Sequence, residues 1–289
     1  MVHQPHQPRA LTPEQVAFYH DHGYLHVPAV FEPELLQAMR DDLEWMIETW
    51  ANKSAGWSGP WRRQYMDETT EAKSQLIAMH DLRFYAASWM RAETHSKLCD
   101  IMADLLDPEG NAGVELHHST MHVKPPESGH PFPMHQDWAF YKHIDNRYVD
   151  VLAHLDDTCH ENGEIRFLDQ SHKLGALEHI TTDPETNEPC TPHLPTDQYR
   201  LEDTVAVPAR AGDVVLFNIH TIHGSYINTT HDMRRMVRIG YRHPDNRQTA
   251  GQSVGRPGLL VRGRRPRQPG QELLTRDAET SNLQPGIEA

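Results

Sequence analysis

The sequence has few cysteines and no long apolar run. Of its 289 residues only three are cysteine, Cys99, Cys159 and Cys190, and no two stand in a Cys-x-x-Cys spacing. Three cysteines exclude a disulfide framework, and the spacing lacks the pair that a structural zinc or dithiol redox site uses. No run reaches the ~18 apolar residues of a membrane span, and the first ten residues lack the apolar stretch of a secretory signal. We therefore expect a soluble, cytoplasmic protein with no membrane partner.

Positive charge is also scarce. The chain carries 27 Lys and Arg against 41 Asp and Glu, which gives a net charge of −14 with His neutral. This balance argues against nucleic acid as a partner. Histidine, in contrast, is abundant, with 22 residues. The length is sufficient to bury a sizeable core, so the size of the chain is compatible with an enzyme.

The first third of the chain has helical patterns. Residues 1–10 are rich in Pro, Gln and His and predict a disordered lead-in. Thr12 and Gln15 then form a capping-box pattern around Pro13, which predicts a helix to about His20 that stops at Gly23 and is followed by an extended piece over 24–30. Apolar residues at helical spacing predict three more helices, over 33–51, 71–90 and 92–106.

Residues 52–66 have no periodicity and predict a long loop. The residues Trp57, Trp61, Arg62 and Arg63 allow two interpretations of this loop. It is either a lid that contacts an anionic substrate or a loop packed on the surface.

From residue 114 onward the pattern changes to short β-prone runs separated by Pro, Gly, Asn and Asp. These runs predict strands over 114–123, 148–155, 164–168, 204–208, 213–219 and 235–242. Many short strands with turn signals indicate a mainly β protein, a sandwich or a barrel. The segment 244–289 is predicted to be a loop-rich tail. Its arginines, Arg262, Arg264, Arg265 and Arg267, are either solvated or a phosphate-binding group.

The first chemical signal is FPMHQDWAFY, residues 132–141, in which His135 and Asp137 stand two residues apart. In an extended strand, residues i and i+2 point to the same face, so the imidazole and the carboxylate converge. With a second histidine, this pair would complete the facial triad that binds Fe(II) and leaves three coordination positions open.

The second signal lies about ninety residues further on, where His220 and His223 follow a predicted buried strand. Either could be the third ligand. We prefer His223 because Ser225 follows closely and Arg234 stands eleven residues later, at the start of another strand. A guanidinium near an iron site is a natural partner for a co-substrate carboxylate. Arg235 is the alternative, since a slip of one residue reverses the face that the strand presents.

A run of polar residues in the 114–123 strand region adds a further candidate set. His117, His118, His122 and Lys124 alternate along the predicted strand, so one subset would line a cavity while the other faces away. The alternative is an ordinary strand surface.

Together these segments resemble the phytanoyl-CoA dioxygenase (PhyH) family of Fe(II)/2-oxoglutarate-dependent oxygenases. The resemblance is carried by LTPEQVAFYHDHGYLHVPAVFEPELL, KPPESGHPFPMHQD, DDTCHENGEIRFLDQSHK and HGSYINTTHDMRR, and it covers most of the chain. It implies a double-stranded β-helix, a jelly-roll relative of the cupins, with helices on one side. We therefore expect a single domain over 11–243, with a helical part at 11–110 and a β-helix core at 111–243.

The resemblance also implies roles for individual residues. His135, Asp137 and His223 would be the Fe(II) ligands and catalytic residues, and Arg234 would bind the distal carboxylate of 2-oxoglutarate. Ser225 would assist Arg234, and Lys124 is placed with them as a co-substrate-binding candidate.

Because Asp137 fills the position that related halogenases leave open, the expected reaction is hydroxylation of an unactivated C–H bond. O2 and 2-oxoglutarate would be consumed, and succinate and CO2 released. The substrate would be a small molecule. Desaturation or cyclisation at the same iron centre is an alternative, as is a cupin-like protein that binds a metal or ligand without turnover.

Overall fold

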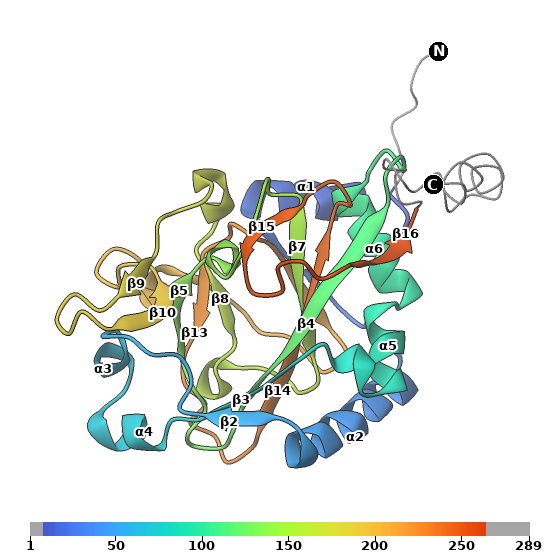
Figure 1. Ribbon diagram of the computed structural model, residues 1–289. Coiled ribbons are helices and arrows are strands. Elements are labelled where there is room, and N and C mark those ends of the chain that lie inside the picture. Colours follow the sequence, from blue (N-terminus) through green and yellow to red (C-terminus); the bar gives the residue numbers. More distant parts are fainter. Residues whose placement is uncertain (1–7, 264–289) are drawn as a thin grey trace, which may run out of the picture.

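A computed structural model describes residues 8–263 of the chain (Figure 1). Within these residues two β-sheets face each other, and helices cover the outer face of the larger one. The expectation of a mainly β protein with flanking helices is confirmed. None of the described helices has both the length and the apolar character needed to cross a bilayer.

The α-helices of the described residues all lie before residue 107, as expected. The Thr12–Gln15 capping box forms, and Gly23 ends the first helix in the left-handed conformation at φ +85°. The α-helices are α1 (Pro13–His22), α2 (Pro33–Thr49), α3 (Arg62–Tyr65), α4 (Glu68–Lys73), α5 (Ala87–Glu93) and α6 (Ser96–Leu106). Five short 3-10 helices are η1 (Leu82–Phe84), η2 (Asp137–Ala139), η3 (His160–Asn162), η4 (Ser171–Leu174) and η5 (Leu201–Asp203).

The larger sheet contains eight described strands in the order β1-β12-β7-β14-β4-β3-β2, with β16 paired to β4. All strand pairs in this sheet are antiparallel. Its strands are β1 (Tyr24–Val27), β2 (Asn52–Ser54), β3 (Leu76–His80), β4 (Val114–Lys124), β7 (Tyr148–His154), β12 (Val214–Asn218), β14 (Arg234–Arg242) and β16 (Leu259–Arg262).

The smaller sheet has the order β11-β8-β13-β5 and lies across from the larger one. Its strands are β5 (Phe132–His135), β8 (Ile165–Phe167), β11 (Val205–Val207) and β13 (His223–Ser225). Two further pairs are formed by β6 (Tyr141–His143) with β15 (Gln248–Gly251), and by β9 (Ile180–Thr182) with β10 (Pro189–His193).

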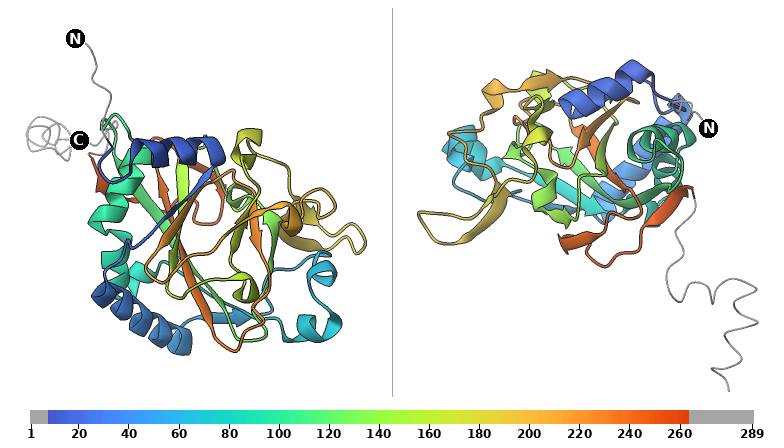
Figure 2. Two further views of the ribbon diagram at one scale, coloured as in Figure 1. Left: turned by 180° about the vertical axis from the view of Figure 1, so that it is seen from behind. Right: turned by 90° about the horizontal axis from the view of Figure 1, so that it is seen from above.

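The period-2 alternation of the strands divides the apolar side chains between two cores. On β7, Val149, Val151 and Ala153 point outward and pack with α2, α5 and α6 in the larger core. Leu152, between them, points inward and joins Phe167 and Phe217 in a smaller core between the sheets. Figure 2, seen from above, shows α2, α5 and α6 on one side of the large sheet and the smaller sheet on the other. The space between the sheets thus holds both apolar and polar groups, and Met236 of the smaller core stands between Arg234 and Arg238 on β14.

Several sequence expectations are wrong in detail, among them the single helix over 92–106, which is divided between α5 and α6. The helix expected over 71–90 is replaced by α4, β3, η1 and α5, because Leu76–His80 pairs with β4 and this tertiary pairing overrides helical propensity. Two segments of the expected tail form β15 and β16, and two segments of the 52–66 loop form β2 and α3. At the start, Arg9 and Ala10 are held by backbone N–H bonds to the Asp104 carboxylate, and residues 1–7 lie outside the described residues.

Candidate active site

Three side chains converge between the sheets from the ends of three short segments. His135 is the last residue of β5, and His223 is the first residue of β13. The two are direct partners across the antiparallel pair, so their rings lie side by side with centroids 4.2 Å apart. Asp137 starts η2 after an extended Gln136, which returns its carboxylate toward the histidines. The His-x-Asp spacing therefore acts as the sequence pattern predicts.

Backbone carbonyls orient both imidazoles. The Nδ1–H of His135 donates to the Pro133 carbonyl at 2.7 Å, and the Nδ1–H of His223 donates to the Thr221 carbonyl at 3.0 Å. Each Nε2 is therefore the unprotonated nitrogen and points at Asp137 Oδ1, at 3.5 Å from His135 and 3.9 Å from His223. One ligand atom from each of the three residues lies within 4.8 Å of the others. Two imidazoles and one carboxylate on one face form the donor set of a non-haem Fe(II) site.

The second oxygen of Asp137 faces away from the histidines. Asp137 Oδ2 lies 2.8 Å from Nη1 of Arg238. Burial opposes ionisation of Asp137, but the Arg238 charge and the neighbouring imidazoles hold the pKa of Asp137 well below its ordinary value. Burial, assisted by the neighbouring His135, lowers the pKa of His223 to about 3. Asp137 is thus held as a carboxylate and His223 as a neutral imidazole, the forms that metal binding requires.

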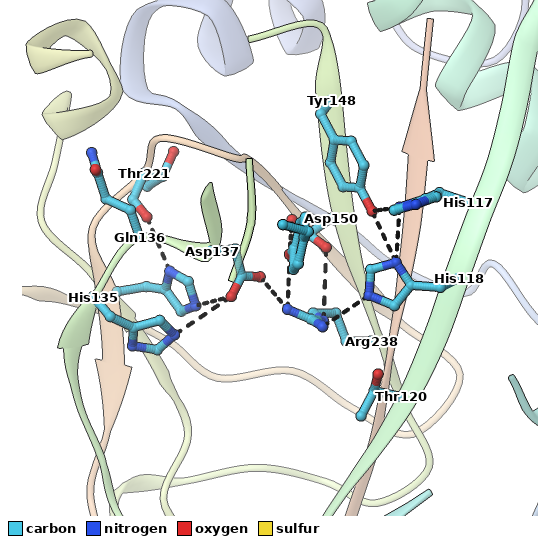
Figure 3. A network of polar contacts seen from close by, with 12 residues as sticks. His117, His118, Thr120, His135, Gln136, Asp137, Tyr148, Asp150, Thr221 and Arg238 are labelled. Carbon is cyan, nitrogen blue, oxygen red and sulfur yellow. Dashed lines mark hydrogen bonds and ion pairs between the residues drawn. The ribbon is translucent and has the colours of Figure 1, made fainter. Parts of the chain in front are cut away.

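Arg238 belongs to a buried polar network that continues behind the triad (Figure 3). Its Nη1 donates to the Tyr141 hydroxyl at 2.8 Å, and its Nη2 lies 3.0 Å from His118 Nε2. The Tyr141 hydroxyl in turn donates to Asp150 Oδ2 at 2.8 Å. Burial and the nearby Asp137 charge raise the pKa of Asp150 well above its ordinary value. A group held by this many partners has little rotational freedom, so Arg238 is a fixed support for Asp137.

The inner faces of β4 and β14 carry a ladder of polar residues. Arg234 lies opposite Lys124, Met236 opposite His122, Arg238 opposite Thr120, and Gly240 opposite His118. His118, His122 and Lys124 therefore share this inner face, and of the three His122 lines the cavity at the triad. At His117 the pairing of β4 with β14 shifts by one residue, and the His117 imidazole contacts His118 and the Tyr148 hydroxyl. The His117 side chain is buried behind the triad, between Tyr148 and Gln248.

At one end of the ladder two cations are buried without a carboxylate. Arg234 is 1% exposed, Lys124 is fully buried, and no described Asp or Glu forms an ion pair with either. The Lys124 ammonium donates to the Ser225 hydroxyl at 2.7 Å and to the Tyr226 carbonyl, while Arg234 Nε has no hydrogen-bond partner among the described residues. Burial lowers the pKa of Arg234 to about 10, and burial together with Arg234 lowers that of Lys124. Burying such charges is costly without an anion, so this arrangement fits a ligand carboxylate.

The structure distinguishes the alternatives that the sequence left open, which are His220 or His223 and Arg234 or Arg235. His220 stands outside the triad, and its backbone carbonyl accepts a hydrogen bond from the Gln136 side chain. Arg235 points to the outside of β14 and forms ion pairs with Asp156 and Glu44. Of the two histidines and the two arginines, His223 and Arg234 are the ones that line the cavity at the triad.

This cavity, which we call the triad cavity, has a volume of about 30 Å³. It is lined by the triad, Ser225, Arg234, Arg238 and mostly apolar neighbours: Trp57, His122, Phe132, Leu152, Gly163, Ile165, Gly224 and Met236. Arg238 is not among the site residues predicted from the sequence. A period-2 count from Arg234 would have placed it on the same face of the strand.

In the loop 52–66, Trp57 fits the lid interpretation, whereas Trp61 and Arg62 fit the interpretation of a packed loop. Trp57 reaches the triad cavity and its ring lies 4.7 Å from that of His135. Trp61 is buried, and Arg62 is held by Glu71 and by the carbonyls of Ala55 and Trp57. Arg62 therefore has a structural role beneath the loop. Of the tail arginines, Arg262 pairs with Asp100, and Arg264, Arg265 and Arg267 lie outside the described residues.

The fold and the site together define a class of protein. A His-Asp-His triad between two facing sheets, with a buried arginine and lysine beside it, is the arrangement of a non-haem iron oxygenase that uses a dicarboxylate co-substrate. The sequence profile of the phytanoyl-CoA dioxygenase (PhyH) family matches residues 19–236, and the chain belongs to this family.

Curated relatives agree with this assignment. The chain is 29% identical over 236 residues to a probable alpha-ketoglutarate-dependent hypophosphite dioxygenase of Stutzerimonas stutzeri, covering 80% of this chain and 79% of the relative. It is 28% identical over 219 residues to the L-proline trans-4-hydroxylase of Streptomyces griseoviridis, covering 70% and 78%. The protein is thus an Fe(II)/2-oxoglutarate-dependent dioxygenase of the PhyH family.

Solved structures show the same fold. The non-heme alpha ketoglutarate dependent carbocyclase SnoK from nogalamycin biosynthesis superposes with a TM-score of 0.67 at 23% identity, covering 88% of this chain and 94% of SnoK. The epimerase SnoN, solved in complex with Fe3+, alpha ketoglutarate and nogalamycin RO, gives 0.63 at 18% identity, covering 88% and 95%. The expected double-stranded β-helix is confirmed. Iron and 2-oxoglutarate are the cofactor and co-substrate of this class.

Proposed function

We propose that this protein hydroxylates an unactivated C–H bond of a small-molecule metabolite, consuming O2 and 2-oxoglutarate and releasing succinate and CO2. The observation that supports this most is Asp137, which fills the third ligand position with its Oδ1 aimed at the histidine nitrogens. A filled carboxylate position leaves three sites for co-substrate and O2 and none for a halide.

In this proposal His135, Asp137 and His223 hold Fe(II). Arg234 receives the distal carboxylate of 2-oxoglutarate, with the Ser225 hydroxyl and the Lys124 ammonium beside it. The buried Arg234 and Lys124 support this assignment, because the distal carboxylate would supply the anion that no described Asp or Glu supplies. A guanidinium forms two parallel hydrogen bonds to one carboxylate, which fixes the direction in which the co-substrate enters.

When bound, iron with 2-oxoglutarate supplies the oxidising chemistry. The chain supplies geometry and shielding. The two Nδ1–H bonds fix the imidazoles, and Arg238 fixes the carboxylate. Trp57 covers His135 with its indole ring, and Leu152, Ile165 and Met236 line the cavity with apolar groups, which exclude bulk water from the reacting C–H bond.

The names of relatives support a small polar substrate and leave the oxidative outcome to experiment. The 28–29% identical relatives are named for L-proline and for hypophosphite. Two structural neighbours are named as a carbocyclase and an epimerase, so the same centre supports other outcomes in other chains. Hydroxylation adds one oxygen atom to the substrate mass, whereas desaturation and cyclisation remove two hydrogens, and mass spectrometry separates these outcomes.

The test is iron-dependent succinate formation from 2-oxoglutarate under O2. We expect turnover in the wild-type protein, loss in Asp137→Ala, and retention in Asp203→Ala, whose carboxylate is half exposed in a surface pair with Arg200. Succinate that forms equally without iron, or equally in Asp137→Ala, would show that the triad is not the catalytic centre. A protein that binds the metal without any turnover would favour the cupin-like binding alternative.

A further inference from the structure

The inner face of β14 carries a second arginine that the co-substrate does not need. Arg234 and Arg238 are four residues apart on one strand, so both point between the sheets, roughly 13 Å apart at about 3.3 Å per residue. Arg234 lies at the end with Lys124 and Ser225. Arg238 touches the opposite side of the triad, at Asp137. One strand thus places a cation on each side of the metal site.

Arg238 also opens onto a second cavity. This space, which we call the side cavity, has a volume of about 110 Å³ and shares Trp57, His122 and Arg238 with the triad cavity. The shared residues make the two spaces neighbours. At roughly 30 Å³ for each water-sized group, the side cavity holds a molecule of only a few heavy atoms.

The polar lining of the side cavity consists of groups that can donate hydrogen bonds. Besides Arg238 and His122, they include Thr120, His80 and Gln252, and none of the described lining residues is acidic. Thr120 stands directly opposite Arg238 on β4, and both lie together in Figure 3. Trp57 and Phe140, with rings 4.8 Å apart, form an apolar wall. The cavity therefore has a donor side and an apolar side.

Two of these donor groups keep nitrogen atoms without a hydrogen-bond partner. Arg238 is 5% exposed, and its Nε has no hydrogen-bond partner among the described residues. Two carboxylates face this guanidinium. Asp137 contacts Nη1, and Asp150 Oδ1 stays 3.8 Å from Nε, beyond hydrogen-bond length. The His122 imidazole forms no hydrogen bond within the described residues and only stacks near Phe132. A buried donor without a partner indicates a missing acceptor.

We propose that the side cavity receives the oxyanion of a small acidic substrate, a carboxylate or phosphonate, with Arg238, His122 and Thr120 as its donors. This inference rests on the proposed function, since it names the substrate class of the same site. The short carbon part of the substrate would lie along Trp57, which spans both cavities, and would reach the triad there. Arg234 then selects the co-substrate and Arg238 the substrate.

The test uses acetate and methylphosphonate as oxyanion probes and acetamide as the neutral match for acetate. Each is titrated anaerobically into the Fe(II)-loaded protein saturated with 2-oxoglutarate, and the shift of the visible charge-transfer band of the chelate is followed. We expect the oxyanions to bind at least about tenfold more tightly than acetamide, because a charge-assisted hydrogen bond is lost with the neutral probe. Acetamide that binds as tightly as acetate would overturn the inference.

Substitutions at two separate histidines, His122 and His231, provide the matched variants. His122→Leu removes a donor of the side cavity without touching a metal ligand, and His231→Leu makes the same change at a side chain that is 92% exposed. We expect oxyanion affinity to fall about tenfold or more in His122→Leu and to stay unchanged in His231→Leu. Equal affinity in the two variants would show that the anion binds elsewhere, for example to the metal itself.

A second readout keeps the inference separate from the proposed function. If the charge-transfer band never forms, the proposed function fails before any probe is added. The side cavity is then tested by the rise in Tm that acetate and methylphosphonate give the protein without iron but with 2-oxoglutarate. A rise that is smaller in His122→Leu than in His231→Leu supports the oxyanion site, and equal rises contradict it.

Discussion

Arg238 contacts one oxygen of the Asp137 carboxylate and leaves the other oxygen directed at the histidines. Asp137 Oδ2 lies 2.8 Å from Arg238 Nη1, while Oδ1 lies 3.5 Å from His135 Nε2. The guanidinium therefore occupies the oxygen that would otherwise be free to chelate a metal together with Oδ1. A carboxylate that offers one oxygen leaves three of six coordination positions open for 2-oxoglutarate and O2. We therefore propose Arg238 as a positioning residue for the metal ligand Asp137.

Arg238→Met should therefore weaken iron binding. Removing an outer partner of a metal-ligating carboxylate typically costs roughly 10–100-fold in metal affinity. The measurement is an anaerobic Fe(II) titration. Arg235→Met is the control, because this neighbouring arginine points outward to Asp156 and Glu44. Equal iron affinity in the wild-type protein and Arg238→Met would contradict the positioning role. Arg238→Lys should recover part of the affinity, because the charge returns.

Arg234→Leu should raise the KM for 2-oxoglutarate without changing iron affinity. The loss of charge-assisted hydrogen bonds to one carboxylate is worth about 1.5–3 kcal/mol, or roughly 10–150-fold in affinity. Steady-state kinetics with varied 2-oxoglutarate measure the effect, again with the same substitution at Arg235 as control. A KM that does not respond to Arg234→Leu, or that responds equally at Arg235, would remove Arg234 from the co-substrate site.

Gly163 leaves room for the Lys124 ammonium because it has no Cβ. Its backbone is left-handed at φ +76°, and a Cβ there would lie 2.3 Å from the Tyr226 carbonyl oxygen and 2.7 Å from Lys124 Nζ. Gly175 has a similar φ of +71° with no atom near its Cβ position. Gly175→Ala should cost only the backbone strain, about 1 kcal/mol.

Gly163→Ala should lower the free energy of unfolding by more than Gly175→Ala does and should raise the KM for 2-oxoglutarate, because Lys124 must move. Urea denaturation and steady-state kinetics measure the two effects. Equal costs in the two alanine variants would mean that the Tyr226 and Lys124 contacts relax freely.

His154 should make the fold sensitive to acid. The side chain is fully buried, and burial, assisted by the Arg234 charge, lowers its pKa to about 3. In the unfolded chain His154 is protonated below about pH 6.5, whereas in the folded protein it is protonated only below about pH 3. The contribution of His154 is therefore complete above about pH 6.5 and is lost as pH falls, by up to about 1.4 kcal/mol per pH unit.

Urea denaturation between about pH 7 and pH 4.5 tests this expectation. The free energy of unfolding should fall less steeply in His154→Leu than in the wild-type protein, and His231→Leu, at an exposed site, should match the wild type. A slope that His154→Leu leaves intact would assign the acid sensitivity to other buried groups.

Local patterns predicted much of the fold. The capping box at Thr12, the amphipathic pattern of α2 and the turn-bounded strands from β4 to β14 are all decided by nearby residues. Leu76–His80 was placed in a helix because its local sequence is compatible with one. The strand forms because β4 offers a partner about forty residues away in the chain. Non-local pairing of this kind leaves no mark in local periodicity.

Some residues of the candidate site could likewise be predicted from local sequence, and others could not. The His-x-Asp spacing and the position of Arg234, eleven residues after His223, can be read along the chain. The role of Arg238 depends on the register between β14 and β4, which sets Arg238 opposite Thr120. Trp57 reaches His135 from a loop that has no periodicity. The candidate metal and co-substrate residues could therefore be proposed from the sequence, whereas the contacts of Arg238 and Trp57 needed the structure.

The central claim is that His135, Asp137 and His223 bind Fe(II) together with 2-oxoglutarate, and one anaerobic titration tests it most directly. Adding Fe(II) and 2-oxoglutarate to the wild-type protein should produce the visible charge-transfer band of the chelate. His223→Ala should abolish the band, and His220→Ala, three residues earlier and outside the triad, should retain it. A wild-type protein without the band, or a band that survives His223→Ala and is lost in His220→Ala, would contradict the assignment.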